Sequence, residues 1–117
     1  MTEIAIDELA ARLAEIAIVD VRTPQEYDGT LGQPCDPRQG HIPGARNVDV
    51  YQLLQLEPSE IESILGIGAG SEVIAYCHSG SRSAIATQML RGLGYDARNY
   101  VGSWHEWSRR DDLPLER

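Results

Sequence analysis

Lysine is absent from this chain of 117 residues, and so is phenylalanine. All basic residues are therefore arginines, ten of them against eighteen acidic residues, which gives a formal net charge of −8 at pH 7. The absence of lysine excludes catalysis through a lysine Schiff base and phosphate binding by a lysine-containing P-loop. The acidic balance argues against a nucleic-acid partner, because such binders carry a basic excess or a basic stripe.

Long apolar runs are also missing. No stretch approaches the roughly 18 apolar residues that a membrane span needs, and no basic region followed by an apolar stretch opens the chain. We therefore expect a cytoplasmic protein that has no membrane partner. The length is close to that of one ordinary domain, so residues 1–117 are predicted to form a single domain.

Cysteine is scarce, with Cys35 and Cys77 as the only two. Two cysteines are too few for a disulfide scaffold, and these lie too far apart for a C-x-x-C redox or zinc pair. A zinc site made of Cys35, His41 and Cys77 has no recognised ligand spacing, so we expect no metal. Each cysteine is therefore interpreted on its own.

Short β-branched apolar runs alternate with helical patterns along the chain. The runs at 17–21 and 73–76 are nearly all apolar, which is typical of strands covered on both faces of a parallel sheet. Further strands are expected at 47–50 and 97–101, and helices at 6–14, 23–26, 59–65, 83–93 and 104–109. This alternation predicts an α/β fold with a mostly parallel sheet and helices on both faces. Ligands of such sheets bind at the carboxyl ends of the strands.

Cys77 lies at such a strand end, directly before a polar turn and a predicted helix. A loop of this kind points several N–H groups inward, and the helix N-terminus adds partial positive charge, so both favour a thiolate. The alternative is a small buried residue that only terminates a strand. The glycine, arginine and helix start that follow favour a nucleophile. The predicted anion cradle consists of His78, Ser79, Gly80, Ser81, Arg82 and Ser83.

Four segments in this order resemble the rhodanese family of sulfurtransferases: Asp20-Val21-Arg22, Gly40-His41-Ile42-Pro43-Gly44-Ala45, Cys77-His78-Ser79-Gly80-Ser81-Arg82-Ser83, and Gly102-Ser103-Trp104-His105-Glu106-Trp107. The long loop before Gly40 and the tryptophan-rich ending are most similar to the catalytic half of two-domain thiosulfate and 3-mercaptopyruvate sulfurtransferases. The resemblance implies a rhodanese-like fold with a five-stranded sheet and no cofactor. It also implies a reaction in which Cys77 takes sulfur from a donor as a persulfide and passes it to a nucleophile.

Thiosulfate or a persulfide is the small-molecule donor that the resemblance implies, and cyanide, a thiol or a protein thiol is the acceptor. Two alternatives stay open: a non-catalytic or sulfur-relay module, and a cysteine-dependent phosphatase or arsenate reductase. The related phosphatases resemble Cys-x5-Arg, whereas the spacing from Cys77 to Arg82 is Cys-x4-Arg. The shorter loop favours sulfur over a tetrahedral oxyanion.

Other polar residues of the four segments receive supporting roles. Arg22 is interpreted either as part of an electropositive substrate rim or as the i, i+4 partner of Glu26. In the two-domain enzymes an arginine usually stands where this chain has Glu26, which leaves the donor open. Asp20 is expected to anchor loops by accepting backbone hydrogen bonds, and His41 to fix a turn.

Three further residues near the motifs are left with open roles. Cys35, in the polar loop 28–39, is interpreted as an incidental surface thiol or, alternatively, as a resolving thiol for Cys77. His78 either tunes Cys77 or faces solvent. His105 receives no role from the sequence.

Overall fold

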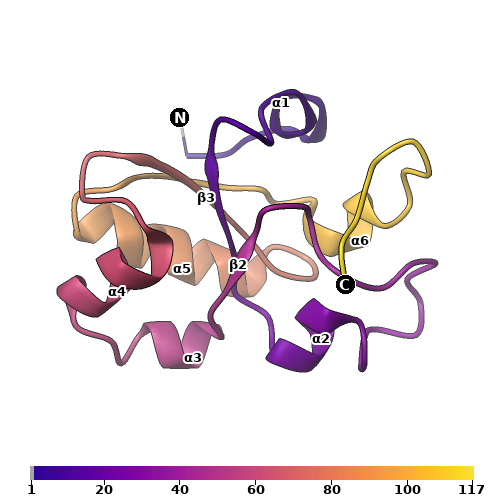
Figure 1. The fold of residues 1–117 in the computed structure, drawn as a ribbon, viewed down its shortest axis with the longest axis horizontal. Helices are drawn as coiled ribbons and strands as arrows, with labels where there is room; N and C mark the ends of the chain where they lie inside the picture. Colours follow the sequence, from indigo (N-terminus) through magenta and orange to yellow (C-terminus); the bar gives the residue numbers. More distant parts are fainter. Residues whose placement is uncertain (1) are drawn as a thin grey trace.

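A computed structural model describes residues 2–117 as a four-stranded sheet flanked by helices (Figure 1). The strand order is β2-β1-β3-β4, and every neighbouring pair is parallel. The strands are β1 (Ala17–Asp20), β2 (Arg46–Asn47), β3 (Glu72–Tyr76) and β4 (Asp96–Asn99). The helices are α1 (Ile6–Ala11), α2 (Pro24–Asp28), α3 (Val50–Leu53), α4 (Pro58–Leu65), α5 (Ser81–Gly92) and α6 (Ser103–Trp107). The predicted α/β class with a parallel sheet is confirmed.

Four strands are present within residues 2–117, as many as the apolar runs predicted and one fewer than the resemblance implied. The position beside β4 is taken by the N-terminal segment, which forms one parallel bridge between Glu3 and Asn99. The Asn99 N–H donates to the Thr2 carbonyl at 2.7 Å, and the Ile4 N–H donates to the Asn99 carbonyl at 3.2 Å. The segment thus pairs with the sheet edge, but its ladder is too short to form a strand.

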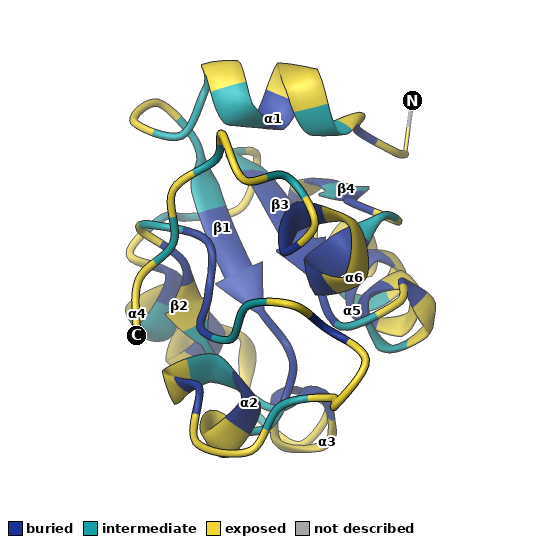
Figure 2. Ribbon diagram, turned by 90° about the vertical axis from the view of Figure 1, so that its right-hand side faces the viewer, coloured by how far each residue is buried: buried dark blue, intermediate teal, exposed yellow. Residues whose placement is uncertain are grey.

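Each face of the sheet has its own hydrophobic core, because successive strand residues point to opposite faces. Val19 and Val73 belong to the core beneath α3, α4 and α5. Ile18 and Ile74 belong to the core beneath α1 and α6, which also holds the two tryptophans. Figure 2 shows β1 and β3 as largely buried strands, while the outer side of α1 is exposed. Within residues 2–117, no helix is long and apolar enough to cross a membrane.

Local sequence signals explain the helices that flank the site. Helix α2 begins with a capping box: the Thr23 hydroxyl accepts from the Glu26 N–H at 3.2 Å, and the Glu26 carboxylate accepts from the Thr23 N–H at 3.2 Å. Helix α5 begins at Ser81 rather than Ser83, because Gly80 has a φ of +101° and makes the turn into the helix immediately. Both helices begin at the same edge of the sheet.

The two central strands, β1 and β3, end side by side at that edge. Asp20 at the end of β1 is in register with Tyr76 at the end of β3. The Val21 N–H continues the pairing by donating to the Tyr76 carbonyl at 3.0 Å. The loops that carry Arg22 and Cys77 therefore leave adjacent strands side by side, as expected for a ligand site of a parallel sheet.

Candidate active site

Cys77 directly follows β3 and is fully buried. Its Sγ atom lies inside the turn that leads into α5. The Gly80 N–H donates to Sγ at 3.1 Å and the Ser83 N–H at 3.4 Å, and the Ser83 hydroxyl lies 3.3 Å away. The turn thus surrounds the sulfur with donors that suit a negative charge.

The ionisation of Cys77 follows from these contacts. Burial raises the pKa of the thiol, because it penalises the charged form. Hydrogen bonds from the Ser83 hydroxyl and from loop N–H groups outweigh burial, so the pKa of Cys77 lies below its usual value. The sulfur is therefore a better nucleophile at neutral pH than an ordinary buried thiol.

Gly80 shapes the turn. Its φ of +101° lies in a region that L side chains rarely adopt, and a Cβ atom would stand 2.8 Å from the Val101 carbonyl oxygen. The Gly80 carbonyl accepts from the Asn99 side-chain amide at 3.2 Å and from the Ala84 N–H at 3.0 Å. Both sides of the residue are thereby fixed, with its N–H aimed at the sulfur.

Helix α6 holds the Cys77 loop from the other side. The Trp104 N–H donates to the Cys77 carbonyl and the His105 N–H to the His78 carbonyl, both at 2.9 Å. The Ser103 hydroxyl accepts from the Cys77 N–H at 3.1 Å and donates to the Tyr100 carbonyl at 2.8 Å. Ser103 has a φ of +56°, unusual for a residue with a side chain. Sequence reasoning gave Ser103 no role, although it lies in a motif that carried the resemblance.

Arg82 is held by Glu26 of α2 rather than left free at the loop. Its guanidinium contacts the two Glu26 carboxylate oxygens at 2.9 and 3.2 Å. Burial raises the pKa of Glu26, but the hydrogen bond from Arg82 helps to keep it below its usual value. The carboxylate thus neutralises the arginine that was expected to attract an anion.

Arg22 does not line a substrate rim, because it is only 1% exposed. It does not pair with Glu26 either. Its guanidinium donates to both Asp20 oxygens and to the Gly40 carbonyl, and it lies against the rings of Tyr76 and Trp104. Asp20 also accepts from the Arg22 N–H at 2.9 Å. The pair ties the end of β1 to the loop before His41.

His41 forms an antiparallel bridge with Glu116 just before the turn at Pro43 and Gly44, and its ring stacks on Tyr27 with centroids 3.7 Å apart. Its Nδ1 lies 2.8 Å from the Tyr27 carbonyl oxygen, and its backbone exchanges two hydrogen bonds with Glu116. These contacts join the C-terminal residues to the turn.

His78 faces the polar loop rather than open solvent. Its Nε2 lies 3.1 and 2.9 Å from the two Asp36 oxygens. Asp36 is buried, and Arg109 contacts its Oδ1 at 3.0 Å. His105 lies beside them, its ring centroid 5.5 Å from that of His78. Sequence reasoning missed Asp36, because nothing in a polar loop signals one buried carboxylate.

Both cysteines are free thiols, and they have different environments. Cys35 is exposed, and its Sγ lies 3.8 Å from Asp36 Oδ1. A hollow of about 460 Å³ borders the Cys77 loop, with Ser79, His105 and Arg109 in its lining. This hollow places solvent-accessible space next to the buried loop.

The match to known proteins agrees with this arrangement. The family model for the rhodanese-like domain matches residues 5–110. The chain therefore belongs to the rhodanese-like domain family, as the four segments predicted.

Three relatives show how much of each protein the similarity covers. A thiosulfate sulfurtransferase of Pseudomonas aeruginosa is 35% identical over 88% of this chain and 41% of its own length. The crystal structure of a probable thiosulfate sulfurtransferase is 44% identical, with a TM-score of 0.83 over 98% of this chain and 47% of that one. The human single-domain sulfurtransferase TSTD1 is 30% identical, with a TM-score of 0.71 over 96% of this chain and 99% of that one. The chain thus spans less than half of the bacterial relative and nearly all of the human one.

Proposed function

We propose that this protein is a rhodanese-type sulfurtransferase in which Cys77 carries the transferred sulfur as a persulfide. The observation that carries the proposal is the set of donors aimed at Sγ, namely the Gly80 and Ser83 N–H groups and the Ser83 hydroxyl. These groups stabilise a thiolate before transfer and a persulfide after it. The human single-domain relative supports the idea that one such domain suffices.

The first half-reaction loads the cysteine. The Cys77 thiolate attacks the outer sulfur of thiosulfate and forms a new S–S bond. The S–S bond of thiosulfate breaks, and sulfite leaves with its electron pair. A persulfide donor reacts in the same way, with a thiolate as the leaving group.

The second half-reaction unloads the cysteine. Cyanide attacks the outer sulfur through its carbon, the persulfide S–S bond breaks, and Cys77 returns to its thiolate. Thiocyanate is released. A small-molecule thiol or a protein thiolate replaces cyanide by attacking the same sulfur, which then leaves as a new persulfide.

The Glu26–Arg82 pair affects which sulfur donor the site prefers. A carboxylate beside the loop arginine disfavours a doubly charged anion such as thiosulfate, since the local positive charge is already compensated. A persulfide of low charge meets less repulsion on approach. We therefore propose a persulfide as the preferred donor, with thiosulfate as a slower one.

A phosphatase or arsenate reductase is a weaker candidate for the same site. The strongest hydrogen bonds to a phosphate come from charged donors, above all from the forked donors of a free guanidinium. Arg82 is occupied by Glu26, and Arg22 is buried against Asp20. Neither guanidinium is available to a tetrahedral oxyanion.

The test is a mass measurement on the purified protein and on Cys77→Ser. After incubation with thiosulfate or a glutathione persulfide, the protein is expected to gain one sulfur atom, which cyanide removes as thiocyanate. Cys77→Ser is expected to gain none, although Cys35 is unchanged. No adduct from either donor, or an equal adduct on Cys77→Ser, would refute the proposal.

The acceptor is tested by discharging the loaded protein. Cyanide and small thiols unload a transferase at comparable rates, whereas a relay module passes its sulfur faster to a protein thiol. Stopped-time assays with cyanide, glutathione and a sulfur-carrier protein thiol separate these cases. Release to cyanide alone would refute a protein acceptor.

A further inference from the structure

Four potential metal ligands from three separate segments meet beside the Cys77 loop. Cys35 and Asp36 come from the polar loop, His78 from the turn after β3, and His105 from α6. One ligand atom of each lies within 4.8 Å of those of the other three. The hydrogen bond from the His105 N–H to the His78 carbonyl fixes two of these segments relative to each other.

The buried carboxylate of Asp36 is the second observation. Its side chain is fully buried, and Oδ2 makes no hydrogen bond of suitable geometry among residues 2–117, although His78 Nε2 lies 2.9 Å from it. Oδ1, by contrast, is held by Arg109 at 3.0 Å. A buried carboxylate oxygen without a donor is costly in a folded protein. The arrangement leaves Oδ2 available to a cation while Arg109 orients the carboxylate through Oδ1, as hydrogen-bonded partners commonly do for metal-ligating groups.

The contact distances fit a small tetrahedral ion. Zinc binds sulfur at about 2.3 Å and nitrogen or oxygen at about 2.0–2.2 Å, so its ligand atoms lie about 3.3–3.6 Å apart. The His78 Nε2 atom lies 2.9 Å from Asp36 Oδ2, while Cys35 Sγ lies 3.8 Å and His105 Nδ1 3.9 Å from the other carboxylate oxygen, Oδ1. Both side chains are exposed, His105 by 51%, so small rotations close the site. Their exposure also gives an ion a path inward.

We propose that Cys35, Asp36, His78 and His105 form a zinc-binding site that is separate from the sulfur carried by Cys77. The mixed set of one thiolate, two imidazoles and one carboxylate suits Zn²⁺, whereas Mg²⁺ and Ca²⁺ require oxygen ligands. Binding converts the Cys35 thiol into a metal thiolate and releases one proton. The bound ion joins the polar loop to the Cys77 turn and to α6.

The sequence predicted no metal site, because Cys35 was considered only with His41 and Cys77. His41 instead stacks on Tyr27, and the Cys77 sulfur is enclosed by its own turn. The ligands that meet are separated in the chain by 1, 42 and 27 positions, from Cys35 to Asp36 to His78 to His105. No recognised motif has that spacing.

The test uses the full chain carrying Cys77→Ser, stripped of metal, so that Cys35 is its only thiol. Co²⁺ is titrated as a spectroscopic probe, and Zn²⁺ is then added as a competitor. One equivalent of Co²⁺ is expected to give a thiolate-to-cobalt charge-transfer band and tetrahedral visible bands, both abolished by Zn²⁺. Because the variant cannot carry sulfur, the result is independent of the proposed function.

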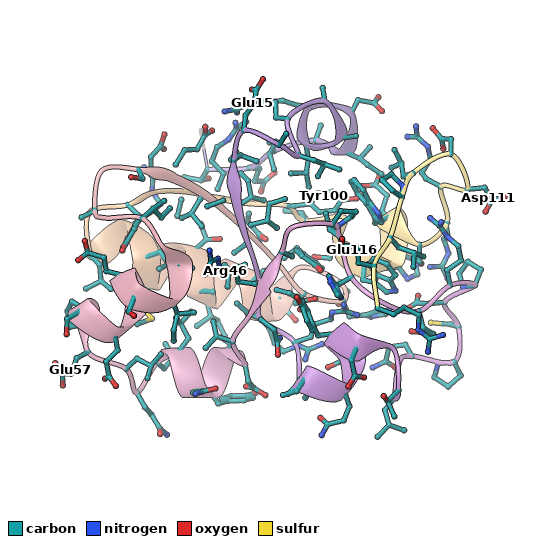
Figure 3. All side chains as sticks on the ribbon, in the orientation of Figure 1. Glu15, Arg46, Glu57, Tyr100, Asp111 and Glu116 are labelled. Atoms are coloured by element: carbon teal, nitrogen blue, oxygen red, sulfur yellow. The ribbon has the colours of Figure 1, made fainter. Side chains whose placement is uncertain are left out.

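Matched variants in the same background assign the ligands. Cys35→Ser is expected to abolish the charge-transfer band, and His105→Gln to weaken Zn²⁺ binding at least tenfold; both residues are exposed, so folding is expected to persist. Asp111→Asn is the control for nonspecific attraction to an acidic protein, because its side chain projects from the molecular surface (Figure 3). It is expected to leave binding unchanged.

Thermal unfolding adds an independent readout. Zn²⁺ is expected to raise the unfolding temperature of the Cys77→Ser protein and not that of the Cys77→Ser, Cys35→Ser protein, because a ligand of the native state stabilises it. The proposal is overturned if no thiolate-to-cobalt band forms. It is equally overturned if Cys35→Ser binds Zn²⁺ as tightly as its parent.

Discussion

The Arg82 guanidinium binds the Glu26 carboxylate through both of its oxygens, at 2.9 and 3.2 Å. Arg82 lies in the first turn of α5 and Glu26 in α2, so the contact joins the helices that follow β3 and β1. The contact compensates the positive charge that Arg82 would otherwise present next to the Cys77 turn. The charge of the site is set by this pair rather than by Arg82 alone.

Glu26→Gln is expected to release Arg82 and to improve thiosulfate as a donor. Gaining one charge-assisted contact of about 1 kcal/mol corresponds to a KM for thiosulfate lower by about fivefold. Glutamine keeps an oxygen for the capping box, so α2 is retained. Steady-state thiocyanate formation measures the effect.

Glu60→Gln is the matched control for that change. Glu60 occupies the same capping-box position in α4, where its carboxylate accepts from the Glu57 N–H at 2.9 Å. The substitution removes one negative charge from the protein without touching Arg82. Equal KM values for thiosulfate in both variants would contradict the role assigned to Glu26.

Ser83→Ala is expected to raise the pKa of Cys77. The Ser83 hydroxyl and N–H are among the groups that hold this pKa below its usual value, and alanine removes the hydroxyl while keeping the N–H. A hydrogen bond to a charged group is worth about 1.5 kcal/mol, so alkylation of Cys77 by iodoacetamide should slow by about tenfold at pH values below its pKa.

The thiolate fraction of Cys77 determines in which direction the pH profile of alkylation shifts. Below the pKa of Cys77 in both proteins the thiolate fraction is smaller in Ser83→Ala, and well above both pKa values the two rates converge. The inflection of the alkylation profile therefore moves to higher pH in the variant. Ser81→Ala is the control, since Ser81 is exposed at the start of α5. An unshifted profile for Ser83→Ala would exclude Ser83 as a stabiliser of the thiolate.

Much of the fold could be predicted because its signals are local. The apolar runs at β1 and β3 and the capping box of α2 each depend on a few neighbouring residues, and all three are present. Within residues 2–117, the fifth strand that the resemblance implied has no longer counterpart than the single bridge at Glu3, which depends on pairing with a distant sheet edge and leaves no local signal. The short helix α3 was missed because four residues capped by Asp49 leave almost no periodic signal.

Only the part of the site that one continuous segment forms could be predicted from the sequence. The Cys77 turn is one segment, so its sequence specified it. The partners of its charged residues come from elsewhere: Arg82 pairs with Glu26 across 56 positions, and His78 meets Asp36 across 42. Arg22 was interpreted as a rim residue or as the partner of Glu26, and it is instead buried, with its charge compensated by Asp20.

Gly80→Ala is expected to disrupt the turn, and Gly92→Ala is not. The first change forces a positive φ on a residue with a side chain and sets a Cβ 2.8 Å from the Val101 carbonyl oxygen, at a cost of about 1–3 kcal/mol. Gly92 ends α5, and a Cβ there would have no neighbour within 4 Å, so alanine stabilises by about 0.5–1 kcal/mol. Urea unfolding and sulfur loading are measured together. Full loading by Gly80→Ala would contradict the need for this backbone conformation.

Asp20→Asn is expected to lower the free energy of unfolding by about 3 kcal/mol, because it leaves the Arg22 guanidinium buried without a countercharge. Asp20 is fully buried, and its Oδ2 lies 2.7 Å from the Arg22 Nη2 atom. Asp112→Asn is the control, because Asp112 pairs with Arg110 at a similar distance, 2.8 Å, but on the surface. Water screens that exposed pair, so its urea midpoint is expected to stay unchanged. Equal urea midpoints for Asp20→Asn and Asp112→Asn would show that the buried Arg22 does not depend on the charge of Asp20. The loop after β1 would then be anchored by the contact of Arg22 with the Gly40 carbonyl.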